Sequence, residues 1–226
     1  MERRTGFRGV VWDVDGTLID SEPLHYEALV AVCGRYDCSV DEEANRSMLG
    51  LSLGAVWDVL TAAGSSFATS RDGWVSEIID YYVDNVDGSM ARPGARETVD
   101  MLEASGVAQA AVSTAERRIV VANLEAVGVH DAMQFAIARE DVVLTKPDPG
   151  PYLAAARRLA LPPSQCVAVE DTPIGVASAR AAGMFVVAFP NAMTNELDFS
   201  AADLRVEHLA EVPWQQLGLT GERTGE

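Results

Sequence analysis

Two carboxylates separated by one residue, Asp13 and Asp15, follow a short apolar run at residues 7–12. That run has the β-branched, apolar character of a buried strand. Because side chains alternate along a strand, both carboxylates leave it on the same side, where they repel each other. A divalent cation, or a division of work between a nucleophile and a proton carrier, would explain the pair. The alternative is a simple Asp-Gly-Thr turn after an edge strand.

Three further groups of polar residues could take part in the same chemistry. Ser113 and Thr114 stand between a predicted strand and a predicted helix, where free backbone N–H groups attract an anion, although Ser-Thr is also a common helix N-cap. Lys146 is the only lysine among 17 basic residues, which indicates a site that requires a compact ammonium rather than a chance surface charge. Glu170 and Asp171 close another apolar run and suit a hard cation such as Mg²⁺, with a helix N-cap at Asp171 as the alternative.

Alternating strands and helices must position these groups. Strands that alternate with helices form right-handed βαβ units and a mainly parallel sheet, whose ligands bind beyond the carboxyl ends of the strands. We therefore expect an α/β fold, and we expect the chain from residue 220 onward to lack order. The predicted strands lie at 7–12, 108–112, 134–138, 166–169 and 184–188, and the predicted helices at 93–106, 116–127, 149–161, 172–182 and near 207–217.

Residues 20–89 show helical spacing only, at about 21–33, 53–63 and 70–86. We expect an all-helical insertion, here called the cap, over residues 20–89, and an α/β core formed by residues 1–19 and 90–226. The aromatic residues of the third helical stretch are interpreted as the hydrophobic core of the cap rather than as a platform for substrate; they are Trp74, Tyr81 and Tyr82.

Composition limits the class of protein. The chain has 226 residues, of which 48% are hydrophobic, and this suits one large or two modest domains. A net charge of -17 repels nucleic acid and anionic membranes. We find no apolar run of membrane-spanning length, no export signal and no CxxC pair among three cysteines, so we expect a cytoplasmic monomer with reduced thiols.

Taken together, the four polar groups resemble the motifs of the haloacid dehalogenase superfamily of phosphotransferases, over nearly the whole chain. The matching segments are DVDGTL at 13–18, a strand ending in Ser113, the Lys146-Pro147 pair and EDTPIGVASARAAGM at 170–184. The stretch at 20–29 resembles the branch that contains β-phosphoglucomutase and many small phosphatases. The resemblance implies a Rossmann-like, doubly wound parallel sheet with an inserted helical cap.

The resemblance also implies a role for each acidic residue. Asp13 would attack phosphorus and become an aspartyl phosphate, and Asp15 would serve as the general acid and base. Mg²⁺ would be held by Asp13, the backbone carbonyl of Asp15, and Asp171, with Glu170 close by.

The remaining residues of the resemblance would bind the phosphoryl group or the substrate. Ser113, Thr114 and Lys146 would hold phosphoryl oxygens, with Lys146 also pairing with Asp13. His25, in the first helix of the cap, would contact the acid–base aspartate; a histidine on the helix surface is the alternative.

The expected function is a Mg²⁺-dependent phosphatase acting on a small phosphorylated metabolite. The alternatives are a β-phosphoglucomutase-like sugar-phosphate mutase and an inactive relative that binds a metabolite or a protein. A mutase needs cations in the cap for a second phosphate. The corresponding loop here contains Leu49 and Gly50, with leucines where those cations are expected. The segment between Leu18 and Met90 has no lysine and only three arginines, Arg35, Arg46 and Arg71. The sequence therefore favours the phosphatase.

Overall fold

The computed structural model describes residues 6–48 and 51–220. The chain forms two compact units. The first contains the residues up to Asp20 and those from Asp87 onward, and the second is Ser21–Val86. The predicted positions Leu49 and Gly50, and the part of the predicted disordered tail at 221–226, lie outside the described residues.

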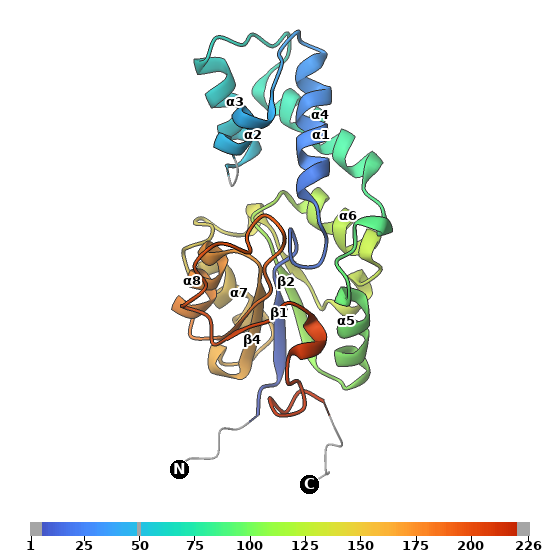
Figure 1. The fold of residues 1–226 in the computed structure, drawn as a ribbon, viewed down its shortest axis with the longest axis vertical. Coiled ribbons are helices and arrows are strands. Elements are labelled where there is room, and N and C mark those ends of the chain that lie inside the picture. Colours follow the sequence, from blue (N-terminus) through green and yellow to red (C-terminus); the bar gives the residue numbers. More distant parts are fainter. Residues whose placement is uncertain (1–5, 49–50, 221–226) are drawn as a thin grey trace. The chain divides into compact units, whose positions relative to one another are not determined.

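A six-stranded sheet forms the centre of the first unit (Figure 1). Every neighbouring pair of strands is parallel, and the spatial order is β3-β2-β1-β4-β5-β6. The strands are apolar because the central ones are buried on both faces. The predicted α/β fold with a parallel sheet is confirmed. The strands are β1 Gly9–Trp12, β2 Ala108–Val112, β3 Ala136–Ile137, β4 Cys166–Glu170, β5 Phe185–Ala188 and β6 Leu204–Arg205.

Helices cover both faces of this sheet, as expected for a doubly wound fold. In Figure 1, α5 and α6 lie on one side of β1 and β2, and α7 and α8 lie on the other. Apolar side chains of α7 and α8, including Tyr152 and Val176, pack with Val11 of β1 into one buried cluster. The helices are α5 Ala95–Ala104, α6 Arg117–Val127, α7 Gly150–Arg158 and α8 Pro173–Ala181, with the short helical turns η1 Gly88–Met90, η2 His130–Ala132, η3 Arg139–Asp141, η4 Pro163–Gln165 and η5 Leu209–Glu211.

The sequence prediction is wrong near the C-terminus. The predicted helix near 207–217 is only the turn η5, and the short strand β6 before it was not predicted. Pro213 explains the failure, because proline lacks the backbone N–H that a helix interior needs and its ring clashes with the preceding turn. Strand β3 is also shorter than the predicted 134–138.

The second unit is helical throughout its described residues. Its helices are α1 Glu22–Gly34, α2 Glu42–Met48, α3 Leu53–Ala62 and α4 Arg71–Asn85. The short α2 was not predicted. The rings of Trp57, Phe67 and Trp74 pack together at centroid distances of 4.6–5.7 Å, and Trp74 and Tyr82 are completely buried. Trp74 and Tyr82 therefore belong to the core of the unit, as predicted. Tyr81 is only partly buried, and its hydroxyl donates to Glu27 at 2.7 Å.

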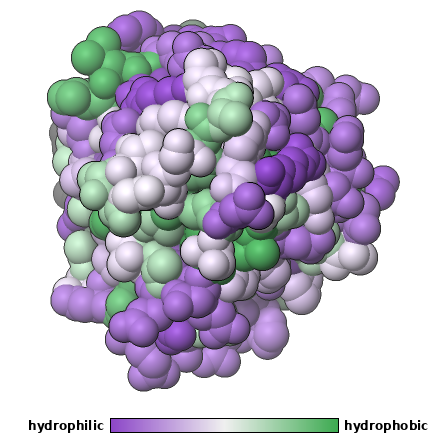
Figure 2. Space-filling model, turned by 90° about the horizontal axis from the view of Figure 1, so that it is seen from above, coloured by the Kyte–Doolittle hydropathy of each residue, from purple (hydrophilic) through white to green (hydrophobic). Residues whose placement is uncertain are grey.

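The surface agrees with the acidic composition. Figure 2 shows a face on which hydrophilic residues predominate, with smaller hydrophobic areas between them. None of the helices in the described part of the chain is long and apolar enough to cross a membrane.

Candidate active site

The candidate site is built at the carboxyl end of β1, the strand between the two halves of the sheet. From β1 the sheet continues to β2 and β3 on one side and to β4, β5 and β6 on the other. In open α/β sheets the crevice at such a point is where ligands bind. Asp13 directly follows β1, and its backbone N–H donates to the carbonyl of Val169 at 3.0 Å. The end of β4 therefore lies beside Asp13.

A glycine lets the chain turn away after Asp13 without blocking the site. Gly16 has a φ of 81°, in the left-handed region that favours glycine. A Cβ at this position would lie 2.1 Å from Asp171 Oδ2. Only glycine therefore fits between the first motif and the carboxylate that follows β4.

Three carboxylates gather around a single ammonium. Asp13, Glu170 and Asp171 are 6%, 0% and 4% exposed, and each offers an oxygen within 4.8 Å of the others. Lys146 Nζ lies 2.6 Å from Asp13 Oδ1 and 2.6 Å from Glu170 Oε1, and it also donates to the carbonyl of Val112 at 3.1 Å. Three buried carboxyl groups thus share the ammonium of Lys146, and Asp171 also interacts with the Arg92 guanidinium.

This imbalance changes the protonation of the site. Burial raises the pKa of Asp13 to about 7, an effect that Lys146 reduces and Glu170 increases. Burial, Asp13 and Glu170 together raise the pKa of Asp171 well above its ordinary value. For Lys146, burial favours the neutral amine, but Asp13 and Glu170 outweigh burial and raise its pKa above 10.5. A further cation is needed if all three carboxylates are to be ionised at neutral pH.

The residues present fit a magnesium ion. All three groups supply hard carboxylate oxygens, which Mg²⁺ prefers. Asp13 Oδ2 is buried and has no hydrogen-bond partner among the described residues, which is costly unless a cation or ligand contacts it. The side chain of Glu170 is fixed by the Tyr152 hydroxyl, which donates to Oε1, and by Gly175, whose missing Cβ leaves room for the carboxylate.

Asp15 lies beside the other predicted phosphate-binding residues. Ser113 Oγ donates to Asp15 Oδ2 at 2.8 Å, and Asn123 Nδ2 donates to Asp15 Oδ1 at 3.0 Å. Ser113 is buried at the end of β2, and Thr114 is exposed next to it. The structure therefore joins Asp15 to Ser113 but does not place the Asp15 side chain in the acidic cluster. Its predicted metal contact is through the backbone carbonyl and stays a prediction.

One of the predicted cap residues, His25, lies among the described residues. His25 belongs to the second unit, where its ring stacks on Tyr82 at a centroid distance of 4.5 Å. Its role toward Asp15 stays a prediction.

Several residues that hold the site were missed by sequence reasoning. Asn191 Nδ2 donates to Asp171 Oδ2 at 2.8 Å, and it follows β5, so the rule of polar strand ends could have found it. Arg92 donates to the carbonyls of Gly16 at 2.6 Å and Pro190 at 3.0 Å. Tyr152 and Asn123 lie inside helices, where no sequence signal distinguishes a positioning residue from any other polar residue.

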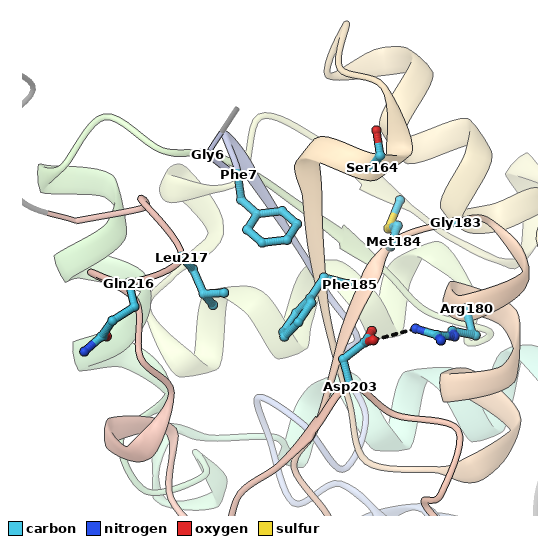
Figure 3. A pocket seen from close by; sticks show the side chains of 10 residues that line it. All are labelled: Gly6, Phe7, Ser164, Arg180, Gly183, Met184, Phe185, Asp203, Gln216 and Leu217. Atoms are coloured by element: carbon cyan, nitrogen blue, oxygen red, sulfur yellow. Dashed lines mark hydrogen bonds and ion pairs between the residues drawn. The ribbon is translucent and has the colours of Figure 1, made fainter. Parts of the chain in front are cut away.

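One pocket in the described part of the chain lies elsewhere and is lined by none of the predicted site residues. It has a volume of about 470 Å³. Figure 3 shows the rings of Phe7 and Phe185 facing it, with the Arg180–Asp203 ion pair at its side. Phe7 precedes β1 and Phe185 begins β5, so this pocket is at the amino end of the sheet, opposite to the end where ligands of such folds bind.

The parallel sheet, with buried carboxylates and a lysine at its central carboxyl edge, agrees with the family expected from the sequence motifs. Residues 10–189 match the haloacid dehalogenase-like hydrolases, and the chain belongs to that family, as a phosphoric monoester hydrolase in the branch that includes the β-phosphoglucomutase-like proteins and phosphatases.

Individual relatives agree with this assignment. Protein CbbY of Rhodobacter capsulatus is 33% identical over 220 residues, covering 93% of this chain and 97% of its own. Hexitol phosphatase B of Escherichia coli K12 is 29% identical over 211 residues, covering 92% and 95%. The crystal structure of CbbY from Rhodobacter sphaeroides with phosphate has the same fold, with a TM-score of 0.82 at 24% identity, covering 92% and 96%. The expected family is confirmed.

Proposed function

We propose that this phosphatase depends on Mg²⁺ and hydrolyses a small phosphate monoester through an aspartyl phosphate on Asp13. The observation that carries the proposal is the state of the Asp13 carboxylate. Lys146 holds Oδ1 at 2.6 Å, whereas Oδ2 is buried without a hydrogen-bond partner among the described residues. One oxygen is thus oriented, and the carboxylate keeps a second oxygen for a cation or for phosphorus.

Asp13, Glu170 and Asp171 would hold the magnesium ion, with the backbone carbonyl of Asp15. When bound, Mg²⁺ supplies positive charge that neutralises the phosphoryl oxygens and relieves the repulsion among these carboxylates. Asn191 and Tyr152 support the site by fixing Asp171 and Glu170 through the hydrogen bonds they donate.

The remaining steps use groups of the chain itself. A carboxylate oxygen of Asp13 attacks phosphorus, the bond from phosphorus to the ester oxygen breaks, and Asp15 gives that oxygen its proton. Asp15, now ionised, removes a proton from water, which attacks the aspartyl phosphate and releases inorganic phosphate. Asn123 keeps the Asp15 carboxylate in place. The single hydroxyl proton of Ser113, which Asp15 accepts in this structure, would turn to a phosphoryl oxygen when substrate binds, and Lys146 and Thr114 would bind the other phosphoryl oxygens.

The charges of the cap favour a phosphatase over a mutase. A mutase must hold a second phosphate dianion with cationic donors. Each arginine in the described part of the second unit instead pairs with a carboxylate of the same unit; the pairs are Arg35–Glu77 at 3.1 Å, Arg46–Glu42 at 3.7 Å and Arg71–Asp58 at 3.0 Å. These pairs support a monophosphate as the substrate.

The relatives suggest the chemical class of the phosphorylated substrate. One is named hexitol phosphatase B, another validoxylamine A 7'-phosphate phosphatase, and CbbY of Rhodobacter sphaeroides was crystallised with xylulose-(1,5)bisphosphate. We infer a small phosphorylated metabolite of polyol or sugar type.

The test is release of inorganic phosphate from a panel of phosphorylated polyols and sugars, with and without Mg²⁺. We expect Asp13→Asn to abolish turnover while its circular dichroism spectrum is unchanged. Asp15→Asn should accumulate a covalent phosphoryl adduct, detected by intact mass, when the substrate has an activated leaving group. Substantial turnover by Asp13→Asn would refute the covalent route. Conversion of β-glucose 1-phosphate to glucose 6-phosphate faster than phosphate release would refute the phosphatase.

A further inference from the structure

The turn that ends α1 brings two cysteines together. Asp37 adopts a left-handed φ of 56°, and the backbone N–H of Cys38 donates to the carbonyl of Cys33 at 3.1 Å. This hydrogen bond joins the first and the last of six residues, and the residue before its donor is left-handed. A helix end of this kind is a Schellman motif. Side chains at the two ends of the motif commonly contact each other, and Cys38 is one of the groups that influence the pKa of the Cys33 thiol here.

The two thiols differ in their access to solvent. Cys33 is buried and Cys38 is partly exposed, with Cys38 Sγ 3.3 Å from Ser65 Oγ. Burial and the neighbouring Cys38 raise the pKa of the Cys33 thiol to about 12, and the indole N–H of Trp74 partly opposes them. A reagent in solution therefore reaches Cys38 first, and Cys33 is the inner partner.

We propose that Cys33 and Cys38 form a dithiol site that reduces a small-molecule disulfide and becomes an intramolecular disulfide. The Cys38 thiolate attacks one sulfur of the reagent RSSR, whose S–S bond breaks and releases RS⁻. Cys33 then loses its proton and attacks the Cys38 sulfur, which releases the second RS⁻. Two protein thiols and RSSR give one protein disulfide and two RSH, so two electrons pass from the cysteines to the reagent.

The geometry favours the second step. The Schellman hydrogen bond holds Cys33 and Cys38 in one turn, so the second attack is an intramolecular step within a short, ordered segment. The third cysteine provides an internal comparison. Cys166 is buried at the start of β4, in the other unit, and burial raises the pKa of its thiol to about 11. It has no neighbouring cysteine in the described chain and should not react.

Peptide mapping tests the proposal, because Arg35 lies between the two cysteines. The full chain is incubated under native conditions with excess oxidised glutathione, alkylated and digested with trypsin. Cleavage after Arg35 separates the peptides 9–35 and 36–46, which stay joined only if the disulfide has formed. We expect joined peptides and a fall from three free thiols to one under denaturing conditions, with an unchanged circular dichroism spectrum.

Two variants define the order of events. In Cys33→Ala, glutathione should remain attached to Cys38, because the resolving thiol is absent. In Cys38→Ser, no joined peptides should form and Cys33 should stay unmodified. Glutathione that persists on Cys38 of the unmodified chain, modification of Cys166 at the same rate, or joined peptides only in denaturant would each overturn the proposal.

Discussion

Replacing Gly175 with alanine tests the idea that the Glu170 carboxylate is fixed by the space a glycine leaves. Gly175 lies in the first turn of α8, and its backbone N–H donates to Thr172 Oγ1 at 3.1 Å. An alanine Cβ would lie 1.9 Å from Glu170 Oε2, 2.0 Å from Cδ and 2.1 Å from Oε1. These distances are far inside van der Waals contact, so the whole carboxylate must move.

Two opposing effects determine how much Gly175→Ala changes the free energy of unfolding. Glycine-to-alanine substitutions stabilise an ordinary helix by up to about 1 kcal/mol. Moving Glu170 breaks its ion pair with Lys146, and breaking a buried ion pair costs about 3–5 kcal/mol. We therefore expect Gly175→Ala to lower the free energy of unfolding by about 2–4 kcal/mol.

Urea unfolding in the presence of a chelator measures this loss. Gly34→Ala is the matched control, because Gly34 ends α1 and a Cβ there meets nothing within 4 Å. The control should be as stable as the unmodified chain or slightly more stable. In Gly175→Ala, the rise in melting temperature caused by Mg²⁺ should also be lost.

A double-mutant cycle identifies the cause of the loss. If the Cβ acts by displacing the carboxylate, Gly175→Ala should cost little in a Glu170→Ala background, where no carboxylate remains. Equal stability of Gly175→Ala and Gly34→Ala, or an undiminished cost in that background, would refute the reasoning.

Three further outcomes are expected. The pKa of Asp13 is raised to about 7 in the folded, metal-free protein, so the stability of this protein should fall as the pH rises from about 4 to 7, because the folded state binds the proton more tightly than the unfolded chain. The stabilisation by Mg²⁺ should grow over the same interval. Melting curves of Asp13→Asn should show a weaker pH dependence, with a remainder from Asp171, whose pKa is also raised. Tyr152→Phe removes the hydroxyl that donates to Glu170 and should cost about 1–3 kcal/mol in urea unfolding; an unchanged midpoint would contradict this. Asn191→Ala frees Asp171 Oδ2 and should weaken Mg²⁺ affinity about 10–100-fold by calorimetric titration, as for other residues that orient a metal ligand.

The fold could be predicted from the sequence largely because strands and helices alternate with clear hydrophobic spacing. Polar residues just after the predicted strands then indicated the site, and the structure brings Asp13, Lys146, Glu170 and Asp171 together. Asp13, Glu170 and Asp171 stand where the chain leaves a buried strand, so that an acidic residue there is conspicuous. Lys146 lies in the loop before α7 and was found because it is the only lysine.

The parts that could not be predicted depend on tertiary contacts. Tyr152 looks like an ordinary helix residue until the fold places its hydroxyl on Glu170. Arg92 reaches the carbonyls of Gly16 and Pro190, which are far from it in the sequence. The predicted C-terminal helix is absent because Pro213 interrupts the segment after η5.

Because the only lysine of the chain is buried in the site, the rate at which it is acylated reports how often the site opens. An acylating reagent needs a neutral amine in contact with water, whereas Lys146 is 6% exposed and held by two carboxylates. Acylation of the native protein should therefore follow the small fraction of time that the site spends open, and each additional 1.4 kcal/mol, roughly, of opening free energy should slow it tenfold. Ligands that bind the closed site should slow the acylation of Lys146 further. The opening of the site can therefore be measured on one native side chain, without an introduced label.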